Sequence, residues 1–391
     1  MAMNSATKIS ADSDFLQPRL NIEKKSRVSR LPWRGQFSPE FVEYILETAL
    51  SNAKHIFDPF CGSGTVIYEA AFKGRTAVGT EVNPSAWHLA ALASLARSTS
   101  SRIDSICIEL DRIILELSNC GYSESSVRGI LSSRSILEDT KKCLIACILL
   151  GMKNSADLNE KNVQYGATTV KKVLREVGIY KGGGECLLED ARHTSLETDT
   201  IDGVITSPPY INVFNYHQNY RPATELLGWN PLSAAKSEIG ANRKHRQNRF
   251  LTVVQYCLDM AMVIDELARV CKKDATVVMV VGRESNILGT SFLNSKLIAR
   301  LFNESHAFTF SNKAERVFTN RFGQEIYEDI LVLNCIGKGY IPQDRARAIG
   351  VDALSSALSS APSSAVDLLR LAINSAAKVL PSPKLDLKRP Y

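Results

Sequence analysis

The chain has 391 residues, 45% of them hydrophobic, which is enough for a sizeable core and longer than a usual single domain. The polar N-terminus has no signal-peptide core, no apolar run approaches membrane-spanning length, and the nine cysteines show no C-x-x-C pair or zinc-finger spacing. These features argue against a membrane or zinc-finger protein and predict a cytoplasmic protein with reduced core cysteines. The net charge of +6 fits a polyanionic partner without requiring one.

The first 30 residues show neither helical nor strand periodicity and carry scattered charges, so we expect a flexible N-terminal arm over residues 1–30. A helix should begin after Ser38, with Pro39 at its first position, because apolar residues then recur at helical spacing. Next, HIFDPF predicts a short strand, CGSGT a glycine turn, VIYEAAFK a helix and TAVGTEV a second strand. This order predicts a βαβ unit.

Helical periodicity dominates from about residue 99 to 182, which predicts a helical insertion. Strand patterns resume in ECLLED and IDGVIT, before a long amphipathic stretch from Phe250 to Cys271 and the β-branched segment ATVVMVV. The segments AFTFSNKAERVF and EIYEDILVLNC are expected to close the sheet. Alternating β and α elements predict an α/β fold with a doubly wound sheet. We therefore expect one α/β domain over 31–98 and 183–340, and a C-terminal tail with one helix over 341–391.

The segment DPFCGSGT carries the first candidate site. Gly62 and Gly64 let the backbone turn tightly and approach a ligand that a Cβ would block, while Thr65 can cap the following helix. Asp58 ends the strand, where it can accept hydrogen bonds or meet a cation. Phosphate binding is disfavoured, because the segment lacks both the P-loop lysine and the third glycine of the dinucleotide fingerprint. Glu81 ends the second strand, where an acidic residue either meets ribose hydroxyls or is only a surface charge.

The segment TSPPY, which directly follows a predicted apolar strand, carries the second candidate site. Two successive prolines end the strand and remove two N–H donors, which leaves carbonyl groups free beside Ser207 and the ring of Tyr210. Such a turn can hold a flat base. An exocyclic amine needs acceptors for its N–H hydrogens, because its lone pair is conjugated into the ring. By itself such a turn is more often a rigid loop than an active site, so the inference depends on its pairing with DPFCGSGT.

Together the two motifs resemble those of the DNA amino-methyltransferases, whose cofactor loop reads D-P-F-x-G-S-G-T and whose catalytic loop reads [DNST]-P-P-Y. The resemblance covers about residues 31–98 and 183–335. It implies a seven-stranded, mostly parallel sheet flanked by helices, a Rossmann-like methyltransferase fold, and S-adenosylmethionine as the cofactor. The cofactor-binding residues that it implies are Phe37, Phe41, Asp58, Phe60, Gly62, Gly64, Thr65, Glu81 and Asp190.

The resemblance further implies a catalytic group made of Ser207, Pro208, Pro209 and Tyr210. Ser207 and the carbonyl of Pro208 would bind the target amine, and Tyr210 would stack on a flipped base. Serine at the first position is similar to the N4-cytosine group, whereas Asp is usual in N6-adenine enzymes. Residues expected to contact DNA are Tyr216, Tyr220 and Arg221, from the resemblance, and Arg243, Lys244, Arg246 and Arg249, from a basic loop whose alternative is a solvated surface.

The sequence therefore predicts a site-specific methyltransferase that transfers a methyl group from S-adenosylmethionine to the N4 amine of cytosine in duplex DNA, with the base flipped out and no metal. The helical insertion is the candidate DNA-recognition region. A restriction-modification role, a cognate restriction endonuclease as partner and a location at the nucleoid follow from the resemblance alone. N6-adenine DNA methylation, RNA base methylation and a catalytically silent DNA-binding protein remain alternatives.

Overall fold

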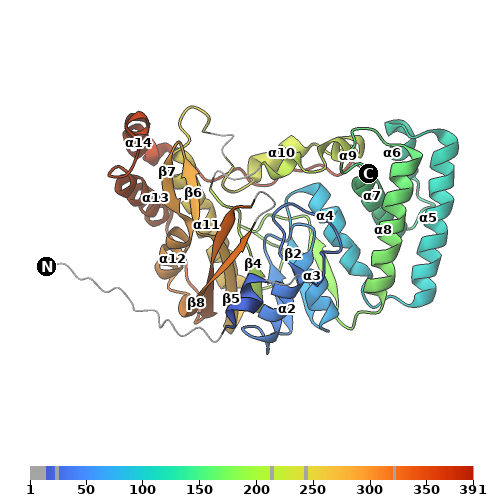
Figure 1. The fold of residues 1–391 in the computed structure, drawn as a ribbon, viewed down its shortest axis with the longest axis horizontal. Coiled ribbons are helices and arrows are strands. Elements are labelled where there is room, and N and C mark those ends of the chain that lie inside the picture. The colour runs from blue at the N-terminus through green and yellow to red at the C-terminus, as the bar shows by residue number, and fades with distance from the viewer. Residues whose placement is uncertain (1–14, 23–25, 212–214, 242–244, 320–322, 391) are drawn as a thin grey trace.

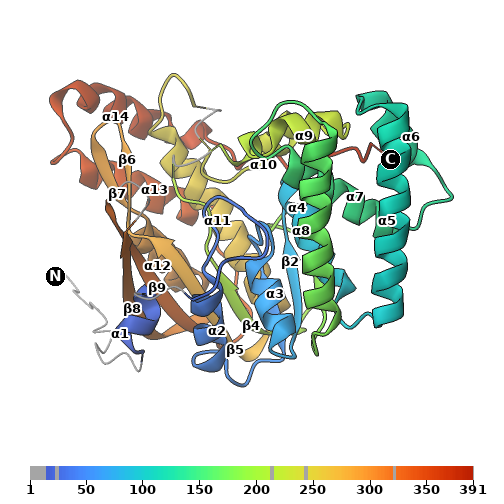
Figure 2. The ribbon, with the colours of Figure 1, turned by 45° about the vertical axis from the view of Figure 1, so that its right-hand side comes forward.

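The computed structural model of the chain describes residues 15–22, 26–211, 215–241, 245–319 and 323–390. Figures 1 and 2 show a central sheet with helices on both faces and a further group of helices beyond one of its edges. Within the described ranges, no helix is both long enough and apolar enough to cross a membrane.

The central sheet has seven strands, and all neighbours from β3 to β5 pair in parallel. The last two strands run antiparallel to their neighbours. This confirms the predicted doubly wound, mostly parallel, seven-stranded sheet. In spatial order the strands are β3 (Gly184–Leu187), β2 (Thr76–Thr80), β1 (His55–Asp58), β4 (Ile201–Thr206), β5 (Cys271–Gly282), β9 (Glu325–Cys335) and β8 (Phe308–Thr319).

Helices cover both faces of the sheet, so successive residues of a strand are buried in two different hydrophobic cores. Ile56 and Ile205 belong to the core under α2 (Pro39–Glu47) and α3 (Thr65–Phe72), whereas their neighbours Phe57 and Val204 belong to the core under α11 and α12. The bounds of these last two helices are α11 (Leu251–Val270) and α12 (Asn294–Ser305). Strands buried on both faces explain the near-continuous apolar runs in the sequence.

The segment predicted as a helical insertion forms four helices beyond the β3 edge of the sheet (Figure 1). They are α5 (Ser100–Cys120), α6 (Glu124–Ser132), α7 (Glu138–Gly151) and α8 (Glu160–Gly178). They share one hydrophobic core with α2 and α3, which includes the buried Cys143 and Cys147. Gly166 lets α8 approach α7 closely, since a Cβ there would lie 2.0 Å from the carbonyl oxygen of Cys147.

Several elements of the fold were not assigned from the sequence. Each of them has only three to seven residues, too few for a period to be recognised. They are α4 (Pro84–Ala90), α9 (Arg221–Leu226), α10 (Pro231–Ser237), the 3₁₀ turns η1 (Ala91–Leu95) and η2 (Tyr216–Gln218), and the hairpin β6 (Glu284–Ile287) and β7 (Thr290–Leu293). The cysteine prediction was nearly right, since eight thiols are buried, but Cys120 is exposed at the end of α5.

The prediction of a flexible arm was wrong for the described part of residues 1–30. Helix α1 (Gln17–Asn21) packs on β8 and α2, and its Leu20 is buried. Arg27 and Arg30 both form ion pairs with Glu69 of α3. Glu69 is fully buried, and a buried carboxylate requires cationic partners, which holds this segment in place. Residues 1–14 and 23–25 lie outside the described part of the chain.

The C-terminal tail has two α-helices instead of the one predicted. They are α13 (Gln343–Ala357), which packs on α11, and α14 (Ser363–Ser375), followed by the turn η3 (Ala376–Lys378). Small buried residues such as Ala346 and Ala357 allow close packing, and in the sequence they looked like a featureless Ala/Ser-rich stretch. After η3 an extended segment, residues 379–390, returns across the molecule to the side of the inserted helices (Figures 1 and 2), where the Arg389 guanidinium lies 5.3 Å from the Trp87 ring centre.

Candidate functional site

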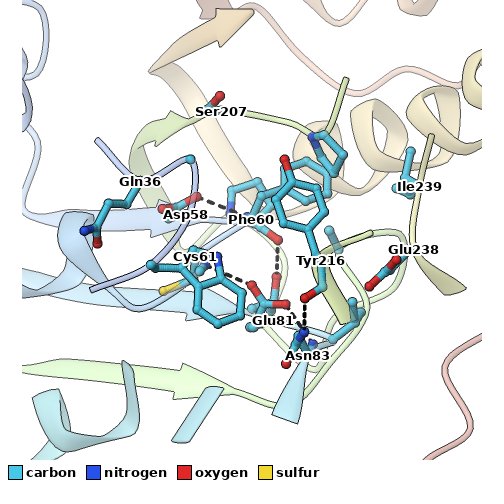
Figure 3. A pocket seen from close by; sticks show the side chains of 18 of the residues that line it. Gln36, Asp58, Phe60, Cys61, Glu81, Asn83, Ser207, Tyr216, Glu238 and Ile239 are labelled. Carbon is cyan, nitrogen blue, oxygen red and sulfur yellow. Dashed lines mark hydrogen bonds between the residues drawn. The ribbon is translucent and has the colours of Figure 1, made fainter. Parts of the chain in front are cut away.

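A pocket opens at the carboxyl ends of β1, β2 and β4. It encloses about 930 Å³, open solvent at its mouth included. Strand β1 has β2 on one side and β4, which follows much later in the chain, on the other, and ligands of doubly wound sheets bind at such a switch point. Figure 3 shows Asp58, Phe60 and Glu81 around this pocket, with Tyr216 opposite them and Ser207 at its edge.

The glycine turn between β1 and α3 forms the floor of the pocket. Gly62 has a φ of +54°, and a Cβ on it would lie 3.0 Å from the Trp33 ring, so the turn and the loop before α2 close on each other. Gly64, with a φ of +93°, is the N-cap of α3, and Thr65 is the first residue of that helix. The expectation that Thr65 caps the helix was therefore wrong, because a left-handed cap position favours glycine.

Glu81 follows β2 and faces the turn across the pocket floor. Its two carboxylate oxygens accept hydrogen bonds from the backbone N–H of Gly62 at 2.9 Å and of Asn83 at 2.7 Å. Burial raises the pKa of Glu81 to about 7, although these hydrogen bonds act in the opposite direction. The carboxylate is thus fixed in orientation and lies at the pocket wall, which it lines.

Asp58 connects the two sequence motifs. One of its carboxylate oxygens accepts a hydrogen bond of 2.6 Å from the hydroxyl of Thr206, the residue before Ser207, and another of 3.1 Å from the Phe60 N–H. Burial raises the pKa of Asp58 to about 7 as well. The first residues of DPFCGSGT and TSPPY therefore touch, although 148 positions separate them in the chain.

Seven of the nine residues predicted to bind a cofactor line this one pocket: Phe37, Asp58, Phe60, Gly62, Thr65, Glu81 and Asp190. Phe41 stands behind Phe37, with ring centres 5.3 Å apart, and is fully buried. Gly64 lies under the turn, where a Cβ would meet Ala90. These two residues support the pocket without lining it.

Asp190 is held by a guanidinium that the sequence analysis did not single out. Arg192 donates from Nε to Asp190 Oδ1 at 2.9 Å and from Nη2 to Oδ2 at 2.6 Å. The same guanidinium reaches Asp259 of α11 at 2.8 Å and the carbonyl of Ser382 at 2.7 Å. Asp259 in turn accepts from the N–H and hydroxyl of Ser382. A pocket residue is thus tied to the C-terminal segment 379–390.

The TSPPY turn lies at the far edge of the pocket. Ser207 and Pro209 line it, whereas Pro208 is buried. Tyr210 packs its ring against Gly282 of β5, where a Cβ would lie 2.5 Å from the ring. The Tyr210 hydroxyl donates to Glu328 Oε1 of β9 at 2.9 Å and lies 3.3 Å from the Ser207 hydroxyl. The contact with Glu328 has no signal in the local sequence, because 118 positions separate the two residues.

The residues predicted to contact DNA lie in several environments. Tyr216 lines the pocket itself. Tyr220, which the resemblance assigned to DNA, is 8% exposed: its ring stacks on Trp33 at 5.9 Å, and its hydroxyl donates to the Pro32 carbonyl. Aromatic packing against the loop before α2 explains this burial.

The predicted basic residues are only partly described by the structure. Arg221 forms an ion pair with Glu225 one helical turn away. Arg246 is exposed and Arg249 half-buried, just before α11. Arg243 and Lys244 lie outside the described residues. Within the described ranges, no group of three His, Cys, Asp or Glu side chains has a geometry that could hold a metal ion.

Comparisons with known proteins match parts of the chain. A family model described as DNA methylase matches residues 13–92. The type II methyltransferase M.MjaII of Methanocaldococcus jannaschii is 36% identical over 53 residues, which are 14% of this chain and 10% of that protein. The chain thus aligns with about a tenth of the length of this relative.

The solved structures with a similar course of the chain include one from Methanosarcina mazei and one from Thermus thermophilus. A SAM-dependent methyltransferase from Methanosarcina mazei aligns over 75% of this chain and 98% of its own, with 14% identity and a TM-score of 0.37. TrmN from Thermus thermophilus aligns over 80% of this chain and 53% of its own, with 12% identity and a TM-score of 0.34. Scores this low carry no argument about what this chain does.

Proposed function

We propose that this chain is a DNA methyltransferase that transfers a methyl group from S-adenosylmethionine to an exocyclic base amine, cytosine N4 in the first place. The observation that carries the proposal is the hydrogen bond between Asp58 and Thr206, which joins the glycine turn and the TSPPY turn in one pocket. A methyl donor and an acceptor base must meet within bonding range, and adjoining turns meet that requirement. The match of residues 13–92 to the DNA methylase model supports the same reading.

The residues of the pocket fit S-adenosylmethionine, whose sulfonium supplies an activated methyl group. Glu81 presents a fixed carboxylate at the end of β2, suited to accept hydrogen bonds from two ribose hydroxyls. Gly62 leaves room over the turn that a side chain would fill against Trp33. Phe37 and Phe60 offer apolar faces for the adenine ring, and the half-buried Asp190 offers an acceptor for its amino group. An acidic, aromatic pocket of this kind suits a cationic nucleoside better than a phosphate.

On the base side, we assign Ser207 to the target amine. Ser207 is one of the residues that line the pocket, and the lone pairs of its hydroxyl would accept an N–H hydrogen and aim the nitrogen at the methyl group. Pro208 and Pro209 fix the turn, and the contacts with Gly282 and Glu328 hold the Tyr210 ring, which we assign to stacking on a flipped base. Ser207 stands directly before the two prolines, where the resemblance favours cytosine N4 over adenine N6.

DNA is expected to approach over the edge of the pocket that carries the TSPPY turn. Arg246, which is exposed, and Arg249, which is half-buried, are proposed to contact its phosphates, together with Arg243 and Lys244, which lie outside the described residues. We propose the inserted helices α5 to α8 as the recognition region, because they do not line the pocket. A cognate restriction endonuclease and a location at the nucleoid are part of the same proposal.

The test is to incubate the purified chain with methyl-labelled S-adenosylmethionine and unmodified genomic DNA, digest the DNA, and identify the labelled nucleoside by mass spectrometry. Labelled N4-methylcytosine is the expected product. Labelled N6-methyladenine would support a DNA methyltransferase but would overturn the inference from Ser207 that the target base is cytosine. Label in RNA alone would change the substrate class, and no label together with salt-dependent DNA binding would identify a silent binding protein.

A further inference from the structure

We propose that Ser207, Tyr210 and Glu328 form a relay that takes the proton from the methylated amine to the Glu328 carboxylate. The inference rests on the proposed methyl transfer and adds a proton acceptor that the two motifs do not contain. Ser207 Oγ lies 3.3 Å from the Tyr210 hydroxyl oxygen, and that oxygen lies 2.9 Å from Glu328 Oε1.

The chemistry of the carboxylate fixes the direction of this chain of hydrogen bonds. An ionised Glu328 has no hydrogen to donate, so the single O–H hydrogen of Tyr210 must point at it. The Tyr210 oxygen can then only accept from Ser207, whose own hydrogen is used in that bond. The free lone pairs of Ser207 Oγ therefore point away from Tyr210 and can accept an amine N–H at the pocket edge. Every hydrogen bond is already oriented for a proton to move from the amine toward Glu328.

Glu328 is held at the end of the relay from two sides. Its second carboxylate oxygen forms an ion pair with Arg316 Nε at 2.8 Å, and only about 8% of each residue is exposed. The Arg316 guanidinium lies 4.4 Å from the Phe41 ring centre and 4.9 Å from that of Phe318, which keeps it from moving away. The charge of Arg316 balances that of Glu328, so an ionised acceptor can stay inside the protein.

The proposed step balances in atoms and charge. The amine nitrogen forms a bond to the methyl carbon as the carbon–sulfur bond breaks, and the nitrogen then carries one proton too many. That proton passes to Ser207 Oγ, the Ser207 hydrogen passes to the Tyr210 oxygen, and the Tyr210 hydrogen passes to Glu328. Burial and the adjacent Glu328 charge raise the pKa of Tyr210 well above its usual value. Tyr210 therefore gives up its proton only as it receives another, and no phenolate forms.

The experiment compares Tyr210→Phe and Glu328→Gln with the unchanged chain, by the single-turnover rate of methyl transfer to unmodified genomic DNA and by the affinity for S-adenosylhomocysteine. Tyr210→Phe keeps the ring and loses the hydroxyl, so a role in base stacking alone predicts an unchanged rate. The relay predicts a fall of at least about tenfold in both variants, with cofactor affinity unchanged within about twofold. A fall smaller than twofold in Tyr210→Phe overturns the relay.

Two further measurements separate a relay from a merely structural contact. In a Ser207→Ala background, removal of the Tyr210 hydroxyl should have little additional effect, because its partner is already absent, whereas a displaced ring would add its own loss. A solvent deuterium isotope effect on the single-turnover rate should be present in the unchanged chain and reduced in Glu328→Gln. Additive losses, or an isotope effect that Glu328→Gln leaves intact, would overturn the proposal.

The matched control is Glu315→Gln. Glu315 precedes Arg316 on β8, is exposed, and forms its own ion pair, with Arg283. The control removes a carboxylate from the same pair of strands without touching the relay, so methyl transfer should continue at the unchanged rate. If the unchanged chain transfers no methyl group to any nucleic acid, the proposed function fails. If the unchanged chain, Tyr210→Phe and Glu328→Gln are equally active, only the relay fails.

Discussion

Glu81 should release a proton when S-adenosylmethionine or S-adenosylhomocysteine binds. In the free protein, burial raises the pKa of Glu81 to about 7. Ribose hydroxyls that donate to its carboxylate favour the ionised form and lower that pKa in the complex. The slope of log affinity against pH equals the number of protons released. Affinity should therefore rise by up to about tenfold per pH unit from pH 5.5 to 6.5 and level off above about pH 7.

The assay is titration calorimetry with S-adenosylhomocysteine, which binds without methyl transfer, between pH 5.5 and 8. Glu81→Gln cannot ionise, so its affinity should be lower at pH 8 and less dependent on pH. Asp58, whose pKa burial also raises to about 7, accounts for any slope that remains, and Asp58→Asn measures that contribution. An equal slope in the unchanged chain and in Glu81→Gln would refute the reasoning, as would affinity that weakens as the pH rises.

The same raised pKa has the opposite effect on folding. Between pH 4.5 and about 7 the folded chain keeps a proton on Glu81 that the unfolded chain has lost, so the free energy of unfolding falls as the pH rises across this interval. A change from 4.5 to about 7 corresponds to roughly 3 kcal/mol. Because bound cofactor favours the ionised carboxylate, it should stabilise the chain more at pH 8 than at pH 5.5. Thermal denaturation with and without S-adenosylhomocysteine measures this difference.

Three further predictions concern other parts of the molecule. Gly166→Ala should lower the free energy of unfolding by roughly 3 kcal/mol in urea denaturation, because a Cβ would lie 2.0 Å from the Cys147 carbonyl oxygen; an unchanged value would show that α7 and α8 separate easily. Ser382→Ala should cost about 1 kcal/mol by the same measurement and weaken cofactor binding through Arg192; unaltered binding would show that the C-terminal segment does not affect the pocket. Arg246→Ala should weaken binding to all duplex DNA alike and reduce the slope of log affinity against log salt by about one; an unchanged slope contradicts a phosphate contact.

The sheet was predictable from the sequence because its strands repeat one physical pattern. In β1 and β4, apolar residues alternate between two cores, which makes each strand a short apolar run that ends at a turn motif. The strands of the hairpin β6–β7 have only four residues each, too few for such a signal. Helix α12 does carry a helical period, since Leu297, Ile298, Leu301 and Phe302 lie on its buried face, but it was not assigned from the sequence. Its first residue, Asn294, is fully buried and bonds to the Gly282 carbonyl and the Ser285 hydroxyl, contacts that no period in the sequence indicates.

The cofactor side of the candidate site was more predictable than the base side, for a geometric reason. Gly62 and Glu81 belong to one βαβ unit, so local sequence order already brings them together, and the structure finds them 2.9 Å apart. Arg192 lies only two positions from Asp190, but its guanidinium is also held by Asp259 and Ser382, which belong to distant parts of the chain. The local sequence therefore did not indicate its role. Tyr220 was predicted to contact DNA because it follows the catalytic motif in the sequence. In the structure its ring is buried against Trp33 of the loop before α2.

The register of the antiparallel strands brings Glu328 next to both Tyr210 and Arg316. Glu328 of β9 pairs with Gly282 of β5 on one side and with Arg316 of β8 on the other. Gly282 has no side chain, so the Tyr210 ring can pack against its backbone beside Glu328. Arg316 provides the cation that pairs with the Glu328 carboxylate. A slip of one residue would turn Glu328 to the opposite face and leave Arg316 without its acid. The parallel half of the sheet thus builds the proposed methyl-donor site, and its antiparallel edge builds the proposed route for the proton.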